Sequence, residues 1–233
     1  MEKIIKIFRS DNKFSEYKIP IEEGMVVLDA LIYIIEHFDS TISARWNCKA
    51  ARCGSCGAEI NGIPKLMCKT RIDSIDTDII IEPLKIFPNI KDLVGNVMQV
   101  WKTKKEMPAF EMINKFNMQK HKLSSTKNLV LYEYDVLRAQ EFKKCIECFL
   151  CLDSCHVIRE HLTNYIGPMH VVNAASLDLN PIDSKDRREF LDKNGIRFCN
   201  VTKCCTEVCP MKIKITDNAI IPEKERINDK KIF

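Results

Sequence analysis

Cysteine spacing in the C-terminal half constrains this chain more than any other feature of its sequence. Two groups of cysteines follow each other there: first Cys145, Cys148, Cys151 and Cys155, and then Cys199, Cys205 and Cys209. The first group is a C-x2-C-x2-C-x3-C run, and Pro210 closes the second. Short loops let three thiolates at three-residue steps converge on one iron–sulfur cubane, while the fourth cysteine serves a neighbouring cluster. The spacing therefore predicts two clusters that exchange ligands between the runs, as in two-cluster ferredoxins.

A different cysteine motif lies in the N-terminal half. Cys48, Cys53 and Cys56 form a C-x4-C-x2-C run, and Cys68 follows it. This is the spacing of plant-type [2Fe–2S] clusters. Gly54 permits the backbone dihedrals and the close approach that a loop needs in order to turn its N–H groups toward cluster sulfur. The motif predicts a third cluster in a domain of its own.

Other interpretations of the twelve cysteines are weaker. A disulfide-bonded secreted protein is disfavoured, because residues 1–10 are a charged, alternating stretch without the features of a secretory signal. Closely spaced cysteines in a reducing compartment usually hold metal. A zinc-stabilised interaction module is the remaining alternative in this class. A visible spectrum separates the two, since zinc thiolates are colourless and iron–sulfur clusters are brown.

Charge and hydropathy indicate which classes of partner the chain could bind. The formal net charge of +4 omits the negative charge that bound clusters and their thiolates would add. The lysines are scattered and not interleaved with aromatic residues, so no nucleic-acid partner is expected. The longest wholly apolar run covers residues 30–35, far short of a membrane span. Any attachment to a membrane is therefore expected to come through a partner subunit.

Residue periodicity predicts strands and one helix in the first half. Alternation or β-propensity indicates strands at 3–8, 14–19, 58–60, 63–67 and 79–81. Asp11-Asn12 and Asn61-Gly62 are the expected turns, the second of type I′. Apolar residues recur at helical spacing over 27–38. Together with the cluster loop, these elements predict a ferredoxin-like β-grasp domain over residues 1–105.

The second half, residues 106–233, is predicted to be an all-α domain with its clusters in the loops between helices. A linker and a helix are expected over 101–126. Further helices are predicted at 129–142, from Pro168 onward, at 183–191 on the surface and at 213–226, with Thr216 or Asp217 as the N-cap of the last. The fold class is α+β: a β-grasp [2Fe–2S] domain followed by a helical ferredoxin-like domain that binds two clusters.

The residues around the first motif resemble a known family. Residues 45–62, RWNCKAARCGSCGAEING, together with IEPL at 81–84 and KDLV at 91–94, are similar to the N-terminal domain of the iron–sulfur subunit of succinate dehydrogenase and fumarate reductase. The C-terminal cysteine pattern is similar to the same family. The resemblance implies three ligand sets: Cys48, Cys53, Cys56 and Cys68 for [2Fe–2S]; Cys145, Cys148, Cys151 and Cys209 for [4Fe–4S]; and Cys155, Cys199 and Cys205 for a third cluster.

Position 202 predicts the type of that third cluster. A full cubane run that began at Cys199 would place ligands at 199, 202 and 205, and position 202 is Thr202. One iron corner then lacks a thiolate, so a [3Fe–4S] cluster is expected, as in the family. Cys204 is interpreted as a small buried side chain that points away from its neighbour. The alternative is that Cys204 supplies a fourth ligand and completes a [4Fe–4S] cluster.

The sequence contains no motif for making or breaking covalent bonds. It has no G-x-G-x-x-G dinucleotide-binding motif, no nucleophile triad and no pair of carboxylates placed for acid–base catalysis. The resemblance implies an electron-transfer subunit of the respiratory chain and the tricarboxylic acid cycle. Its partners would be a FAD-containing flavoprotein subunit that acts on succinate or fumarate, and a membrane-anchor subunit that binds quinone. The chain would lie peripherally on the cytoplasmic face of the inner membrane and pass electrons one at a time through three clusters.

The quinone end departs from the better-known members of the family. Those members have proline, a small polar residue and an aromatic pair that includes Trp after the cysteine matching Cys155, and histidine after the cysteine matching Cys199. Here His156 and Asn200 follow these cysteines, without an aromatic pair. His156, Asn200 and Thr202 are the candidate quinone-proximal residues, and a related complex with a thiol or heterodisulfide acceptor is the alternative function. The other histidines lack metal-ligand spacing; they are His37, His121, His161 and His170.

Overall fold

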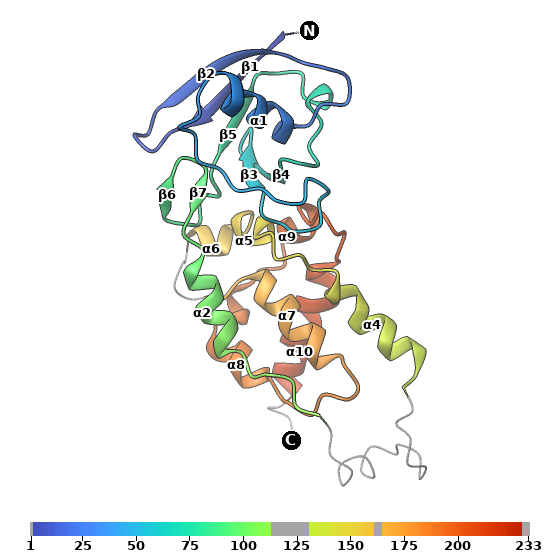
Figure 1. Ribbon diagram of the computed structural model, residues 1–233. Coiled ribbons are helices and arrows are strands. Elements are labelled where there is room, and N and C mark those ends of the chain that lie inside the picture. The colour runs from blue at the N-terminus through green and yellow to red at the C-terminus, as the bar shows by residue number, and fades with distance from the viewer. Residues whose placement is uncertain (1, 113–130, 161–164, 230–233) are drawn as a thin grey trace.

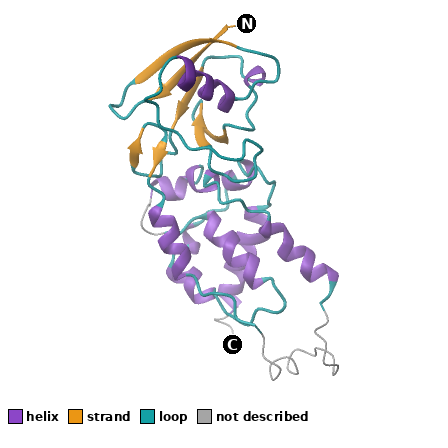
Figure 2. Cartoon of the chain, viewed as in Figure 1, coloured by secondary structure: helices purple, strands orange, loops and turns teal. Residues whose placement is uncertain are grey.

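The computed structural model describes residues 2–112, 131–160 and 165–229 of the chain. Strands occupy one end of an elongated molecule and helices the other, with the short helices α5, α6 and α9 between them (Figure 1, Figure 2). This arrangement confirms the predicted α+β class, with a strand-rich first half and a helical second half.

A five-stranded sheet forms the N-terminal half. Its strands are β1 (Glu2–Phe8), β2 (Phe14–Pro20), β3 (Gly57–Ile60), β4 (Ile63–Leu66) and β5 (Ile79–Glu82). Their order is β2-β1-β5-β3-β4, and β1 pairs parallel with β5 while the other pairs are antiparallel. The 3-10 helix η1 (Ile72–Ser74) and the hairpin β6 (Asn89–Lys91) and β7 (Val94–Gly95) complete this half. The five predicted strands are confirmed, whereas the β6–β7 hairpin was not predicted.

The helix α1 (Val27–His37) covers the sheet because its apolar stripe needs burial. Leu28, Leu31 and Ile34 have no exposed surface, and Ile5 and Ile7 of β1 are equally buried in the same core. Burying each such side chain stabilises the fold by roughly 1.5–3 kcal/mol. The β3–β4 turn has positive φ at both central residues, Asn61 (50°) and Gly62 (75°), as a type I′ turn requires.

The C-terminal half is helical. Its elements are α2 (Met98–Glu106), α4 (Glu133–Lys143), α5 (Leu150–Asp153), α6 (His156–Glu160), α7 (Pro168–Asp178), α8 (Arg188–Lys193), η2 (Ile196–Phe198), α9 (Cys204–Glu207), the π-helix η3 (Ile215–Ile220) and α10 (Ile221–Asp229). Helix α7 begins at Pro168, as predicted, and contacts α4, α5 and η3. None of the described helices combines the length and apolar composition that crossing a bilayer requires.

The helix predicted over 183–191 is wrong in its first half, because α8 begins only at Arg188. The physical reason is Arg187, which is fully buried rather than on the surface. Its guanidinium donates hydrogen bonds to the carboxylates of Asp178 and Asp183 at 2.7 and 2.8 Å, and to the backbone carbonyls of residues 108 and 109. This network of distant partners holds residues 184–187 in a non-helical conformation.

Three other helix predictions need correction. Neither Thr216 nor Asp217 is an N-cap: the helical segment begins at Ile215, after Lys214. Within the predicted helix at 129–142, α4 starts at Glu133, and residues 129 and 130 lie outside the described part. Helix α2 starts before the linker predicted over 101–126, and residues 113–126 lie outside the described part as well. The division of the chain at 105/106 stays a prediction.

Candidate metal centres

The loop before β3 turns its backbone toward sulfur. Three of its residues have positive φ: Lys49 (53°), Ala51 (53°) and Gly54 (71°). These dihedrals fold the loop back on itself, so that the N–H groups of Ala50 and Arg52 donate hydrogen bonds to the Cys48 Sγ at 3.4 and 3.3 Å. The loop thus directs two N–H groups toward a cysteine sulfur, while contacts with cluster sulfur stay a prediction.

The four thiols of this first site lie close together but differ in acidity. The Ser55 hydroxyl lies 3.1 Å from the Cys53 Sγ. Hydrogen bonds, the one with Ser55 foremost, lower the pKa of Cys53 to about 6. Burial instead raises the pKa of Cys56 to about 12, and charge on Cys68 and Cys53 adds to this effect. Cys53 is therefore a thiolate near neutral pH, while Cys56 releases its proton only to a metal.

The second site is a small cavity with four thiols on its wall: Cys145, Cys148, Cys151 and Cys209. The other lining residues are apolar, among them Phe149, Met169 and Ile213. Burial raises the pKa of Cys148 to about 12 and that of Cys151 well above its ordinary value, and charge on the neighbouring thiols raises both further. Four adjacent thiolates, two of them buried and two half-buried, are costly without a cation, so this donor set fits an iron–sulfur cluster.

A third group of thiols lies beyond the second. Burial raises the pKa values of Cys155 and Cys205 to about 11, and charge on Cys204 and Cys199 raises both values further. The Cys205 Sγ also lies 3.4 Å from the Thr216 Oγ1. The structure thus brings the predicted cysteines into three groups, although their ligation of clusters stays a prediction. The hydroxyls of Ser55 and Thr216 were not predicted, since no sequence spacing marks them.

Cys204 does not lie where it was expected. It was interpreted as buried and pointing away, but it is only half-buried at the first position of α9. Its Sγ lies 3.6 Å from the Thr202 Oγ1. The left-handed conformation of Lys203 (φ 66°) reverses the chain just before α9 and leaves the Cys204 thiol beside the third group rather than behind it.

The candidate quinone-proximal residues are partly brought together. The Thr202 Oγ1 lies 3.4 Å from the Nδ1 of His156, which is half-buried at the start of α6. Asn200 and Thr202 are both exposed. Of the remaining histidines, His37 is exposed and His170 is buried, while His121 and His161 lie outside the described residues.

The described residues contain no group of three or more His, Cys, Asp or Glu side chains that could hold a single metal ion.

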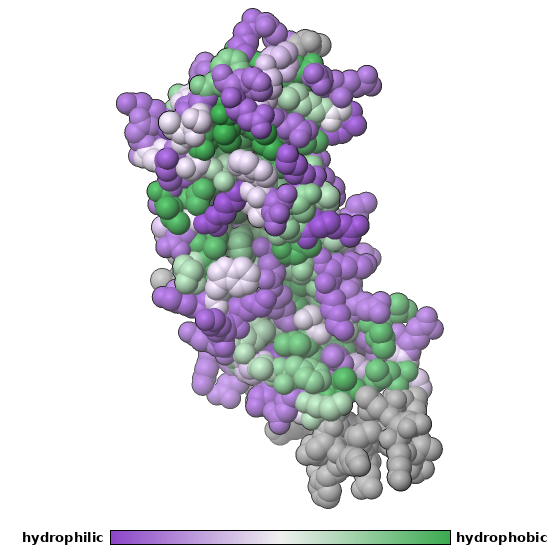
Figure 3. Space-filling model, viewed as in Figure 1, coloured by the Kyte–Doolittle hydropathy of each residue, from purple (hydrophilic) through white to green (hydrophobic). Residues whose placement is uncertain are grey.

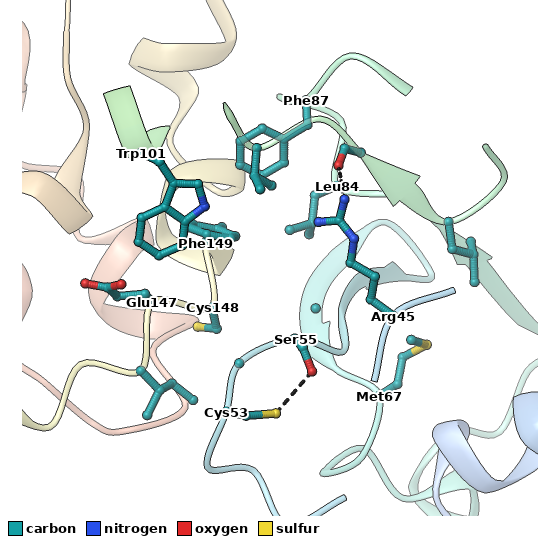
Figure 4. A pocket seen from close by; sticks show the side chains of 16 residues that line it. Arg45, Cys53, Ser55, Met67, Leu84, Phe87, Trp101, Glu147, Cys148 and Phe149 are labelled. Atoms are coloured by element: carbon teal, nitrogen blue, oxygen red, sulfur yellow. Dashed lines mark hydrogen bonds between the residues drawn. The ribbon is translucent and has the colours of Figure 1, made fainter. Parts of the chain in front are cut away.

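The first and second sites meet across a narrow seam. A Cβ placed on Gly54 would lie 2.6 Å from the Ile146 carbonyl oxygen and 2.9 Å from the Cys148 Cα. Beside this contact is a cavity of about 340 Å³ (Figure 4). Cys53 and Ser55 line it from the first loop, and Cys148 and Phe149 line it from the loop before α5. The two cysteine loops are therefore direct neighbours.

Ion pairs to two buried carboxylates also connect the two halves of the chain. Glu59 of β3 and Asp153 of α5 are both fully buried. Arg159 forms ion pairs with both, at 3.2 Å from Asp153, and Lys85 pairs with Glu59 at 2.6 Å. Removing either cation would leave a buried carboxylate uncompensated, at a cost below the roughly 3–5 kcal/mol of a fully buried pair, because Arg159 and Lys85 are 35% and 49% exposed. The pairing holds the sheet of one half against the helices of the other.

Comparisons with known proteins agree with this geometry. Residues 4–102 match the model of a 2Fe-2S iron-sulfur cluster binding domain, and residues 141–213 match that of a 4Fe-4S dicluster domain. The fumarate reductase iron-sulfur subunit of Mycobacterium tuberculosis is 30% identical over 84% of this chain and 79% of its own length. A chain of the Mycobacterium smegmatis Sdh1 complex in the apo form is 41% identical, with a TM-score of 0.89 over 100% of this chain and 98% of that one.

Longer archaeal proteins match as well. One of them, from the fumarate reductase (CoM/CoB) of Methanothermobacter marburgensis, is 30% identical over 88% of this chain. The chain spans 39% of the length of that relative, and 41% of an uncharacterized iron-sulfur protein of Methanococcus maripaludis. The bacterial and the archaeal relatives thus both match nearly the whole of this chain. The match covers less than half of the length of each of these two archaeal proteins.

Proposed function

Because the chain belongs to the iron–sulfur subunit family of succinate dehydrogenase and fumarate reductase, we propose that it carries electrons between two partner subunits. One partner is a FAD-containing flavoprotein that interconverts succinate and fumarate, and the other is a membrane anchor that binds quinone. The observation that supports this most is the row of three thiol groups, with the first and second in contact at Gly54. Bound iron–sulfur clusters would supply the one-electron redox chemistry.

The proposal assigns each thiol group to one cluster. The ligands are Cys48, Cys53, Cys56 and Cys68 for [2Fe–2S]; Cys145, Cys148, Cys151 and Cys209 for [4Fe–4S]; and Cys155, Cys199 and Cys205 for [3Fe–4S]. The first cluster belongs to a domain of residues 1–105, and the other two belong to a domain of residues 106–233.

The chain's own residues then set spacing and solvent access. Gly54 lets the first loop approach the backbone at Ile146 and Cys148, which shortens the path between two redox centres. Apolar side chains such as Phe149 and Met169 keep water from the second site. Backbone N–H groups hold the Cys48 sulfur, and such donors tune the potential of a bound cluster.

The proposed partner subunits determine where in the cell the chain would lie. We place the chain on the cytoplasmic face of the inner membrane, held there by the anchor subunit. The third group of thiols, with His156 and Thr202 beside it, would face the anchor and its quinone. The face shown in Figure 3 mixes polar and apolar side chains. No nucleic-acid partner is proposed.

The test uses the complex isolated from its own cells through a tag on this chain. We expect the flavoprotein subunit to co-purify. Succinate should reduce the clusters, seen as bleaching of the visible absorption, and fumarate should restore the colour. Clusters that respond to neither compound would overturn the proposal.

A second candidate function is electron exchange with a thiol or heterodisulfide couple instead of quinone. It is favoured by the CoM/CoB named for the Methanothermobacter relative and by the absence of an aromatic pair after Cys155. The same isolated complex decides between the two. Oxidation of the succinate-reduced clusters by a quinone analogue, but not by a disulfide, supports the first candidate, and the reverse result supports the second.

A further inference from the structure

The second and third thiol groups differ in the side chains that face them. Among the described residues that line the second group's cavity, none carries a side-chain hydroxyl; the residues other than cysteine are Ile146, Phe149, Met169, Val172, Pro210, Met211, Ile213 and Ile215. Two buried hydroxyls, those of Thr216 and Tyr165, adjoin the third group instead. Thr216 is 1% exposed and Tyr165 is 4% exposed.

The hydrogen bonds of Thr206 and Thr216 show to which acceptor the Thr216 hydroxyl donates. The Thr206 Oγ1 accepts the backbone N–H of Thr216 at 3.0 Å and donates its single hydrogen to the Thr216 Oγ1 at 3.1 Å. A hydroxyl has one donor hydrogen, so the hydrogen of Thr216 must go elsewhere. The Cys205 Sγ lies 3.4 Å from the Thr216 oxygen. A ligating thiolate can only accept, so Thr216 donates to Cys205.

Tyr165 supplies the second hydroxyl. Its side chain is packed in the same core as Cys155 and Cys205. Its hydroxyl finds no hydrogen-bond partner among residues 2–112, 131–160 and 165–229. The thiols of Cys199, Cys155 and Cys205 lie near enough for their charge to act on the Tyr165 hydroxyl. A phenol is protonated at neutral pH and has one hydrogen to donate, so the acceptor here is a cluster sulfur or a ligating thiolate.

We propose that Thr216 and Tyr165 raise the reduction potential of the third cluster, each by donating a hydrogen bond to sulfur. Reduction adds negative charge to a cluster, and a donor directed at its sulfur stabilises the reduced form. The described wall of the second site carries no such hydroxyl, so a cluster there would receive no hydrogen bond of this kind from it. The difference favours electron movement from the second site to the third. This inference rests on the ligand sets proposed above.

The test is a redox titration of the isolated complex, followed by electron paramagnetic resonance of each cluster. Thr216→Val and Tyr165→Phe remove one hydroxyl each with little change in shape. Each should make reduction of the third cluster roughly tenfold less favourable, a shift of about 59 mV to more negative potential for a one-electron couple. The first and second clusters should keep their potentials, and Thr216→Ser should restore the wild-type value.

Matched controls remove hydroxyls elsewhere. Thr103→Val deletes a hydroxyl that bonds its own helix at Gln99, and Tyr17→Phe deletes one that bonds Asp39; neither should move the third potential. An unchanged third potential in both Thr216→Val and Tyr165→Phe, with the cluster signal intact, would overturn the inference. Absence of a third cluster signal from the wild-type complex would instead refute the ligand assignment.

Discussion

Gly54→Ala tests the contact between the first two sites. Gly54 has φ +71°, and an added Cβ would lie 2.6 Å from the Ile146 carbonyl oxygen and 2.9 Å from the Cys148 Cα. Both neighbours are backbone atoms, so no side-chain rotation relieves the overlap. The loops must separate, or the seam must rearrange.

The cost has two parts. A non-glycine residue in the left-handed region costs roughly 1–2 kcal/mol, and overpacking a buried contact adds roughly 1–3 kcal/mol. Gly62→Ala is the matched control, because Gly62 has φ +75° but nothing within 4 Å of an added Cβ. Gly62→Ala should lose only the stability that the left-handed backbone costs. The difference in stability between the two variants, about 1–3 kcal/mol, then measures the overpacking at the contact between the two sites.

The assay is the apparent thermal midpoint of the cluster-loaded protein, with both variants heated at one rate. For a chain of this size, 1 kcal/mol shifts the midpoint by roughly 2–4 °C, so Gly54→Ala should unfold about 2–12 °C below Gly62→Ala. Reduction of the second cluster through the first should also slow in Gly54→Ala only. Equal midpoints and equal reduction rates for the two variants would refute the close contact.

Three further predictions concern ligands and pH. Cys209→Ala should abolish the [4Fe–4S] resonance and leave the [2Fe–2S] resonance intact; loss of the latter instead would show that the ligand sets are wrong. The oxidised wild type should show the near-isotropic [3Fe–4S] resonance, and Thr202→Cys should replace it with that of a [4Fe–4S] cluster. If the wild type lacks this resonance and Cys204→Ser creates it, Cys204 is the fourth ligand. Burial raises the pKa of Glu223 from its ordinary 4.5 to about 7, so the folded chain binds this proton more tightly than the unfolded chain does, and stability should fall by about 3 kcal/mol between pH 4.5 and 7. Glu223→Gln should remove that slope in unfolding titrations; an identical slope in the variant would contradict the assignment.

Local patterns predicted most of the architecture. The strands and α1 follow from residue alternation and helical spacing, because one buried face is enough to define each of them. Spacing within each short loop predicts which thiols of that loop converge, because a few residues determine the geometry there. The ligand sets, which join Cys209 to the first run and Cys155 to the second, came instead from the resemblance to the family.

The errors arose where a distant partner decides the structure. Arg187 is one charge in a polar stretch of the sequence, yet the Asp178 carboxylate and the carbonyls of residues 108 and 109, all outside the predicted helix, bind it and delay the start of α8. Thr216 was predicted to cap a helix from its residue type, yet its hydroxyl forms hydrogen bonds with the side chains of Thr206 and Cys205. The place of Cys204 depends on the left-handed backbone at Lys203, which no residue-type preference predicts.

The position of Cys148 and Leu150 bears on how the cell matures this protein. Both belong to the cysteine run of the helical half, yet both are buried in the core that contains the isoleucines of the sheet. Once the two halves dock, that core closes over Cys148, whereas Cys145 and Cys209 of the same thiol group stay half-buried. A bond between Cys148 and iron is therefore expected to form before docking, and its repair after oxidative damage should require the seam to open.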